Sequence, residues 1–392
     1  MDVPRMPVVV LLLLCGALQA GEFTLVKVDG EEVSGPLKAV DAEKGLTVGA
    51  QTVALTDLEE VTVQGARAEA LGTQPEVVLR NGDRLAAAVL SGNENELKIK
   101  SELLGELTLK SGVLRGIVFR PKVPLAEGTV NAFFEGADPD QDKLLTARGE
   151  SLSGFMGAFT DKDLTFEVGG QKSTHTFEDL AGFRFAALEA FKGAEGVKAS
   201  VRLADGSALS GRLAGLANGI LQIEAAAGLT WAVPLGKVLR IGVSGGKLTY
   251  LGDLEPKSAE QLPLVGGSPV AFPLRKDRAA NGTSLNIGKQ EYEKGLGVHS
   301  YSKLTYDLGG GYALFLADVG LDASAPAGAV CSWKVLVDGA EKAQGESKGT
   351  QPAQKVKVAL AGGKTLELIC DYGSDNDDAG DHLNWAKARL VK

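Results

Sequence analysis

Short runs of alternating apolar and polar residues, separated by glycine-containing turns, fill most of the chain between residues 24 and 243. In Leu97-Lys98-Ile99-Lys100 and Leu221-Gln222-Ile223-Glu224 the alternation has a period of two, which is typical of a strand with one buried and one wet face. The turn Asn81-Gly82 accepts the positive φ angles that a tight hairpin requires. The pattern predicts an all-β chain of short antiparallel strands.

One order of strands and turns returns four times in this region. Each copy has a strand, a glycine turn, a second strand with another small residue, and three further short strands. Repetition in units of 40 to 44 residues indicates a repeated structural unit. Five short strands with a sharp glycine bend in the second resemble the small SH3-like or Sm-like barrel. The copies span residues 24–63, 76–119, 143–185 and 200–243.

A four-bladed propeller is the rival architecture for these repeats. Their turn glycines are spaced 52, 67 and 57 residues apart, whereas propeller blades usually keep a steadier period. Separate or paired barrels therefore fit better, and we expect them to act as a spacer or docking platform. The turn glycines are Gly30, Gly82, Gly149 and Gly206. We expect small-barrel repeats at 21–66, 74–120, 128–187 and 198–244, followed by a different domain at 247–392.

The first 20 residues have the features of a secretory signal peptide. Arg5 precedes an apolar run from Val8 to Leu14, and small residues follow up to Ala20. We expect cleavage after Ala20, with Ala17 as the alternative. The apolar run is far shorter than the roughly 20 residues that span a bilayer. The pattern predicts an exported protein, periplasmic or extracellular, without stable membrane insertion.

Charge and composition narrow the choice of partners. The 392 residues include 41 Lys+Arg and 50 Asp+Glu, a formal net charge of −9, which does not favour a phosphate backbone as partner. Although Sm barrels bind RNA, the repeats lack clustered basic residues and stacking aromatics, so we expect no nucleic acid partner. The 51 glycines, about 13% of the chain against a usual 7% or so, agree with many turns.

Two cysteines remain once the signal is removed. Cys331 and Cys370 each occupy an inward position of a predicted strand. In an exported protein a single disulfide and two buried thiols are both compatible with this placement. A catalytic thiol is not expected, because neither cysteine has a histidine or basic residue close in sequence to lower its pKa.

The distribution of aromatic and polar residues changes after Lys247. Two of the three tryptophans, Trp333 and Trp385, and two of the three histidines, His299 and His382, lie beyond this point. Indole faces pack on the C–H face of a pyranose, and imidazole, amide or carboxylate groups fix its hydroxyls. The combination favours a sugar-binding region.

The same region resembles the NPCBM module that accompanies glycoside hydrolase family 98. The most extended match is Leu285 to Leu308, which contains Gly295-Leu296-Gly297-Val298-His299. Further matching elements are Tyr250 to Pro256, Phe315 to Asp322, Trp333 to Gly339 and Asp381 to Leu390. The resemblance covers residues 247–392 and implies a galactose-binding-like β-sandwich with jelly-roll topology. Alternation in Trp333-Lys334-Val335-Leu336-Val337 agrees with such strands.

The resemblance suggests a set of candidate sugar-binding residues, each of which also has a structural alternative. His299 is either a buried hydrogen-bonded residue or a partner for a sugar hydroxyl. Trp385 precedes the predicted last strand, so it either contacts sugar or fills the sandwich core. The candidates are His299, Tyr301, Trp333, Asp381, His382, Asn384 and Trp385.

An acidic run lies next to the last of these candidates. Residues 371–381 contain five carboxylates, which suits a hard cation such as Ca²⁺ but lacks EF-hand spacing. The alternatives are a structural Ca²⁺ site and a solvated acidic loop. The candidate ligands are Asp375, Asp377, Asp378 and Asp381.

These patterns predict an exported, non-catalytic carbohydrate-binding protein whose C-terminal module binds a glycan, with a galactose-type sugar favoured. A glycoside hydrolase needs two carboxylates about 5–10 Å apart in a cleft of a catalytic domain. Small barrels already occupy residues 21 to 243, so we expect no catalytic residues. The alternative is a cell-envelope scaffold that binds envelope proteins and carries a non-functional sugar site.

Overall fold

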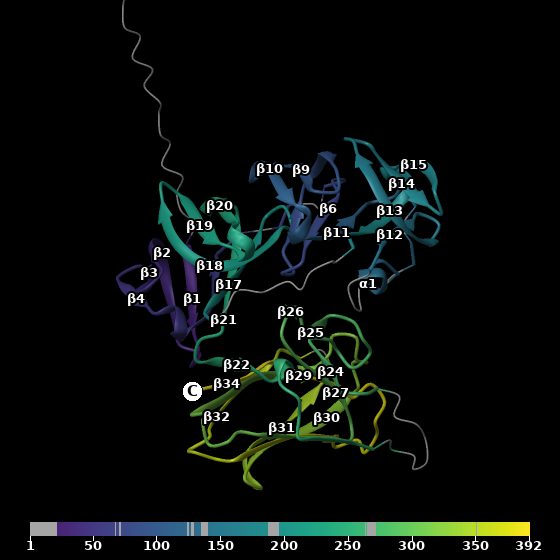
Figure 1. Ribbon diagram of the computed structural model, residues 1–392. Coiled ribbons are helices and arrows are strands. Elements are labelled where there is room, and N and C mark those ends of the chain that lie inside the picture. The colour runs from purple at the N-terminus through teal and green to yellow at the C-terminus, as the bar shows by residue number, and fades with distance from the viewer. Residues whose placement is uncertain are drawn as a thin grey trace, which may run out of the picture.

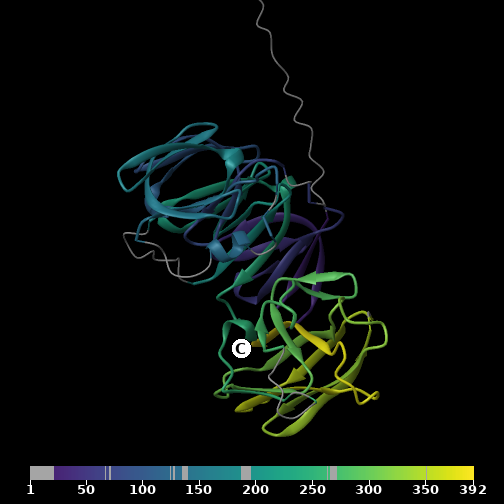
Figure 2. The same ribbon diagram turned by 90° about the vertical axis from the view of Figure 1, so that its right-hand side faces the viewer.

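The computed structural model describes residues 22–66, 68–69, 72–123, 125–126, 129–134, 140–186, 196–262, 264, 272–349 and 351–392. The predicted signal peptide, 1–20, lies outside the described residues. An array of small β units sits above a separate β-sandwich, and the side view shows the same two bodies (Figures 1 and 2). The prediction of an all-β chain is confirmed. Within the described part, no helix has both the length and the apolar character needed to cross a membrane.

The first unit of the array contains five strands, paired in the order β5-β1-β2-β3-β4. Its strands are β1 (Glu22–Lys27), β2 (Glu32–Asp41), β3 (Gly45–Val48), β4 (Gln51–Val53) and β5 (Leu58–Val63). Strands β1 to β4 form an antiparallel meander, a single 3₁₀ turn follows, and β5 returns to pair with β1. Inward side chains such as Phe23 and Leu25 are buried, as the alternating pattern requires.

The other three units repeat this connectivity, and in each the last strand pairs with the first. The second unit consists of β6 (Glu76–Leu79), β7 (Arg84–Ala86), β8 (Ala88–Gly92), β9 (Glu96–Ser101), β10 (Gly105–Lys110) and β11 (Leu114–Val118). The third consists of β12 (Asp142–Thr146), β13 (Ser151–Phe159), β14 (Asp163–Val168), β15 (Gln171–Thr176) and β16 (Leu180–Arg184). The fourth consists of β17 (Lys198–Leu203), β18 (Ala208–Ala217), β19 (Ile220–Glu224), β20 (Thr230–Pro234) and β21 (Val238–Ser244). The assignment to SH3-like or Sm-like barrels stays a prediction.

A close backbone approach explains the small residue in the second strand. A Cβ at Gly154 would lie 2.2 Å from the carbonyl oxygen of Glu167, and one at Gly211 would lie 2.3 Å from that of Glu224. In both cases the oxygen belongs to the next strand, which the second strand bends over. Only glycine fits such a position.

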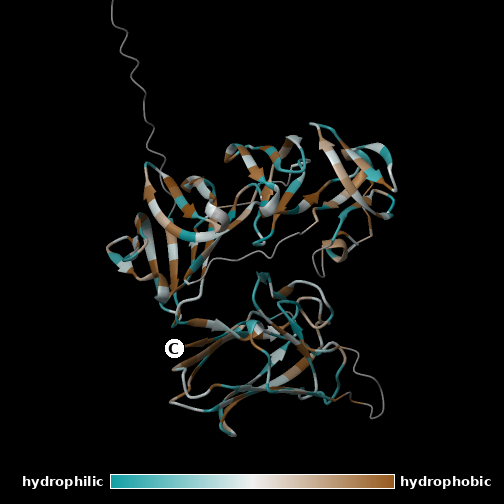
Figure 3. Ribbon diagram, viewed as in Figure 1, coloured by the Kyte–Doolittle hydropathy of each residue, from teal (hydrophilic) through white to brown (hydrophobic). Residues whose placement is uncertain are grey.

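The units are not arranged in sequence order. The last strands of the first and fourth units, β5 and β21, pair with each other, and so do those of the second and third, β11 and β16. A third joint connects the second and fourth units through β7 and β18. The spatial order is therefore first, fourth, second, third, and the strands of all four units form one hydrogen-bonded set. In Figure 3 apolar and polar residues alternate along these strands.

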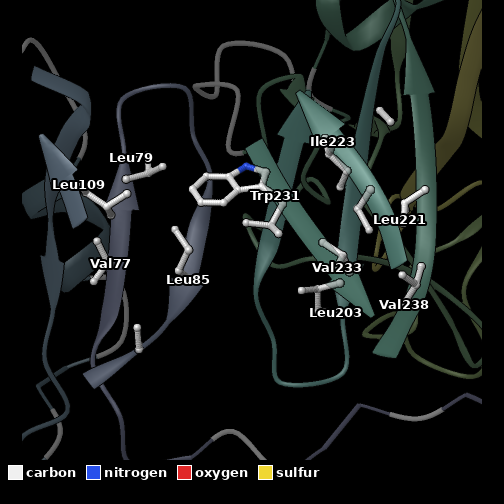
Figure 4. Close-up of a cluster of buried hydrophobic side chains, with 14 of the residues drawn as sticks. Val77, Leu79, Leu85, Leu109, Leu203, Leu221, Ile223, Trp231, Val233 and Val238 are labelled. Carbon is white, nitrogen blue, oxygen red and sulfur yellow. The ribbon is translucent and has the colours of Figure 1, made fainter. Parts of the chain in front are cut away.

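Trp231 fills the joint between the second and fourth units. Its indole lies between Leu79 and Leu85 of the second unit and the core of the fourth (Figure 4). Its Nε1 donates a hydrogen bond to Asp83 Oδ2 at 3.1 Å, and Ser210 Oγ donates to Asp83 Oδ1 at 2.5 Å. Burial raises the pKa of Asp83 even though these bonds favour its charged form.

The sandwich contains two facing sheets. The larger sheet has the order β24 (Arg275–Lys276), β27 (Gly295–His299), β34 (His382–Val391), β29 (Leu314–Leu321), β32 (Gln354–Ala359), with β22 (Leu248–Tyr250) also paired to β34. The other has the order β23 (Ser258–Gln261), β28 (Ser302–Asp307), β33 (Thr365–Tyr372), β30 (Val330–Val337), β31 (Ala340–Lys348). A hairpin of β25 (Leu285–Ile287) and β26 (Gln290–Tyr292) completes the domain. The predicted β-sandwich is confirmed.

Buried ion pairs join the array to the sandwich. Glu59, 1% exposed, and Glu60 lie on β5, and Lys387 and Arg389 lie on β34. Arg389 Nη2 is 2.6 Å from Glu59 Oε2, and Lys387 Nζ contacts both glutamates. On the array side Arg240 Nε is 2.6 Å from Glu60 Oε2. We call these five residues the interdomain ion network.

Candidate functional site

Three rings gather where β27 ends and β34 begins. His299 and His382 are paired residues of these two strands, and their ring centroids are 5.1 Å apart. Phe272 stacks on His299 at 4.9 Å with an interplanar angle of 18°, and it meets His382 edge-on at 4.5 Å. All three side chains are half-buried, so part of each is open to solvent. We call Phe272, His299 and His382 the three-ring cluster.

Hydrogen bonds directly behind the cluster fix the chain that follows β27. His299 Nδ1 donates to the carbonyl oxygen of Ser300 at 2.8 Å. Ser300 Oγ donates to Asp381 Oδ2 at 2.6 Å, which ties this turn to the residue before β34. Tyr301 follows and is half-buried. The structure therefore places His299, Tyr301, Asp381 and His382 on two adjoining segments, and their contact with sugar stays a prediction.

The ionisable groups of this region are tuned by burial. Desolvation raises the pKa of Asp381 to about 7; the bond from Ser300 opposes the rise, and the nearby charges of Asp375, Asp377 and Asp378 add to it. Burial lowers the pKa of His382, and the neighbouring His299 lowers it further against the attraction of Asp322. The His382 imidazole is therefore neutral at pH 7.

Two buried polar atoms beside the cluster are unpaired. Among the described residues, neither Asp381 Oδ1 nor His382 Nδ1 has a hydrogen-bond partner. A buried polar atom without a partner costs about 1–3 kcal/mol. Both atoms have almost no solvent-accessible surface, so they lie beneath the half-exposed rings.

Two of the predicted sugar-binding residues need correction, because their indoles lie inside the sandwich. Trp333 is 4% exposed and Trp385 is 0% exposed. Their rings meet edge to face at 6.0 Å within the core between the two sheets. The inward-facing positions of β30 and β34 place them there, so neither indole offers a face to a ligand.

Asn384 needs the same correction. It is fully buried, and its Nδ2 donates to Asp322 Oδ2 at 2.8 Å and to the carbonyl oxygen of Asn286 at 3.2 Å. Asp322 in turn accepts from Ser324 Oγ at 2.5 Å. Asn384 therefore anchors both β25 and the loop that follows β29, and its side chain does not face solvent. Asp381, 1% exposed, likewise acts from beneath the surface.

The acidic run follows β33 and is exposed over part of its length. Asp375 and Asp377 are exposed, and Asp377 Oδ1 accepts from the backbone N–H of Ala379. Across the described ranges, no three His, Cys, Asp or Glu residues converge in a way that could hold a metal ion. The choice between a structural Ca²⁺ site and a solvated loop for Asp375, Asp377, Asp378 and Asp381 stays a prediction.

Residues 247–391 match the NPCBM/NEW2 domain family. The resemblance inferred from the sequence is confirmed: the C-terminal part of this chain is similar to NPCBM/NEW2 domains. A protein of Renibacterium salmoninarum (strain ATCC 33209) described as "Putative endo-alpha-N-acetylgalactosaminidase" is 31% identical over 127 residues. That match covers 30% of this chain and 8% of the relative, so the chain spans a small fraction of the relative's length.

Two solved structures from Clostridium perfringens are also similar. The CBM51 module of GH95, in complex with methyl-galactose, is 30% identical with a TM-score of 0.33, covering 37% of this chain and 99% of that one. The structure of CBM51-2 in complex with GlcNAc, together with the INT domains of ZmpB, is 30% identical with a TM-score of 0.32, covering 44% of this chain and 36% of that one. The two-sheet sandwich of this chain is defined by its own strand pairing.

Proposed function

We propose that this chain is an exported, non-catalytic carbohydrate-binding protein whose sandwich binds a galactose-type sugar at the three-ring cluster. The observation that carries the proposal is the half-exposed cluster beside two unpaired buried polar atoms, Asp381 Oδ1 and His382 Nδ1. Ring faces pack on the C–H face of a pyranose, and a small number of polar groups fix its orientation.

The comparisons support the choice of ligand class. The matched domain family is of the carbohydrate-binding type, and the relative from Renibacterium salmoninarum is named for N-acetylgalactosamine, a galactose-type sugar. Transfer of that preference to this chain is part of our proposal. The non-catalytic role belongs to it as well.

Export and the role of the array complete the proposal. The signal-like pattern of residues 1–20 supports a periplasmic or extracellular location. The array then serves as a spacer or docking platform for the sandwich. The interdomain ion network fixes the orientation of the sandwich on the array.

Calorimetric titration of the full chain with galactose and N-acetylgalactosamine tests the proposal. Replacing Phe272 or His382 by Ala removes a ring that touches the sugar, so each variant is expected to lose about tenfold or more in affinity, equivalent to about 1.4 kcal/mol. Phe155→Ala is the matched control, because Phe155 is 59% exposed but lies on the third unit of the array. Its affinity is expected to equal that of the unmodified chain.

One observation favours a cell-envelope scaffold as the second candidate function. Trp231, Trp333 and Trp385 are all buried, so no indole is available at the site. If the folded chain binds none of the galactose-type sugars, the scaffold is the better explanation.

A further inference from the structure

Two thiols face each other inside the sandwich. Cys331 on β30 and Cys370 on β33 are fully buried and free, and their Sγ atoms are 3.1 Å apart. Cys331 is paired with Tyr372, and Cys370 with Trp333. The cysteines are therefore diagonal neighbours on the inward face of two adjacent antiparallel strands.

We propose that Cys331 and Cys370 are a disulfide-forming pair, joined when the chain folds in the presence of a low-molecular-weight disulfide. The first cysteine thiolate attacks the donor disulfide and releases one thiol, leaving a mixed disulfide. The second cysteine thiolate then attacks the protein sulfur of the mixed disulfide and releases the other thiol. The two cysteines lose two protons and two electrons, and the donor is reduced to two thiols.

The geometry of the pair supports this bond. The two sulfurs are 3.1 Å apart on adjacent strands held by a continuous ladder, so each lies within reach of the other. The other contacts that Cys331 Sγ makes are with the carbonyl oxygens of Ser332 and Asp371, and neither competes as a reaction partner.

Burial sets the stage of folding at which the bond forms. The hydrogen bond with Cys370 and desolvation both raise the pKa of the Cys331 thiol, so in the folded domain it is protonated and inert. Exchange with a soluble disulfide therefore has to occur before the two sheets close. Once formed, the bond is shielded from reductants by the same core.

The bridge would lie at the base of the loop that carries Asp381. Strand β33 ends at Tyr372, two residues after Cys370, and the chain then runs through 373–381 to the three-ring cluster. A bond from Cys370 to β30 would hold the start of this loop. This consequence for sugar binding rests on the proposed function, whereas the bond itself does not.

Refolding of the full chain with Cys15→Ser, so that only the pair carries thiols, tests the proposal. One sample refolds with oxidised and reduced glutathione and the other with excess reductant. Each is then unfolded without reductant and treated with iodoacetamide. We expect no labelled cysteine after oxidative refolding, an intact mass lower by two hydrogen atoms, and two labelled cysteines after reductive refolding.

Further variants separate the bond from general effects of oxidation. Cys331→Ala and Cys370→Ala should each leave one cysteine that labels after reductive refolding and that, after oxidative refolding, either labels or carries one glutathione. The oxidatively refolded parent should have a higher Tm than the reductively refolded parent, and the double variant should show no such difference. Two labelled thiols in an oxidatively refolded, native chain, or glutathione adducts on both, would overturn the proposal. Sugar titration of the same samples is a separate readout, so failure of the bond and failure of sugar binding are distinguishable.

Discussion

Asp381 is a buried carboxyl group beside the three-ring cluster, and its protonation affects the stability of the fold. One oxygen of its carboxyl accepts a hydrogen bond from Ser300 Oγ, and the other oxygen has no partner among the described residues. Burial raises the pKa of Asp381 to about 7 from an ordinary value of about 3.9. Between these two pH values the folded state binds more protons at this group than the unfolded state. Its contribution to stability therefore falls as the pH rises from about 4 to about 7.

Asp381→Asn removes this dependence while keeping an oxygen that accepts from Ser300. We expect the variant to gain in Tm over the unmodified chain, and the gain to be larger at pH 8 than at pH 5, measured by thermal unfolding. Asp375→Asn is the control, because Asp375 is exposed, and its difference from the unmodified chain should not vary with pH. An equal gain for Asp381→Asn at both pH values would contradict the role given to burial.

The residues of the site divide into those that the sequence could identify and those that it could not. Strand pairing brings His299 and His382 together, and their positions in matched motifs made both visible in advance. The indoles of Trp333 and Trp385 were equally visible, but their burial depends on the inward direction of β30 and β34. Phe272 was missed, because it lies between strands in a stretch without periodicity and only its packing on His299 reveals it.

At the level of elements, the strand order within each unit was predictable and the order of the units was not. The turn glycines and the period of two are local signals, so they locate strands such as β9 and β19. The pairing of β5 with β21 joins segments about 180 residues apart and leaves no local signal. Trp231 contacts Asp83 of another unit, and this contact likewise leaves no local signal in the sequence.

The glycine of the second strand provides a test at this scale. Gly154→Ala places a methyl group 2.2 Å from the Glu167 carbonyl oxygen. The next strand cannot move away from this methyl group without losing its pairing with the second strand. We expect a loss of about 1–3 kcal/mol in the free energy of unfolding, measured by chemical denaturation. Gly112→Ala, where a Cβ meets nothing within 4 Å, should change stability by less than about 0.5 kcal/mol.

At the level of the whole molecule, the interdomain ion network makes the array and the sandwich one mechanical unit. Only residues 245–247 connect β21 to β22, so covalent linkage and the ion network act at the same place. Buried charges of this kind are costly to separate, because either partner alone is left uncompensated. Glu59 illustrates the balance: burial raises its pKa, and the charges of Arg389 and Lys387 oppose the rise.

Arg389→Met is expected to destabilise the chain by about 3–5 kcal/mol, because Glu59 then keeps only Lys387 at 3.5 Å. Adding Glu59→Gln should recover part of this loss, since no buried charge is left without its partner. Thermal unfolding of the full chain measures both. Lys122→Met, which removes an exposed pair with Glu178, should cost less than about 1 kcal/mol, and a comparable loss there would contradict the importance of burial.

The chain contains three histidines, which allows the sugar site to be observed directly. His299 and His382 belong to the three-ring cluster, whereas His175 lies on β15 of the third unit and bonds to Ser173. Titration of the full chain with N-acetylgalactosamine, followed by the imidazole C–H signals in proton NMR, compares all three at once. We predict saturable shifts for His299 and His382 and none for His175; unchanged signals from both cluster histidines at saturating sugar would contradict binding at this site.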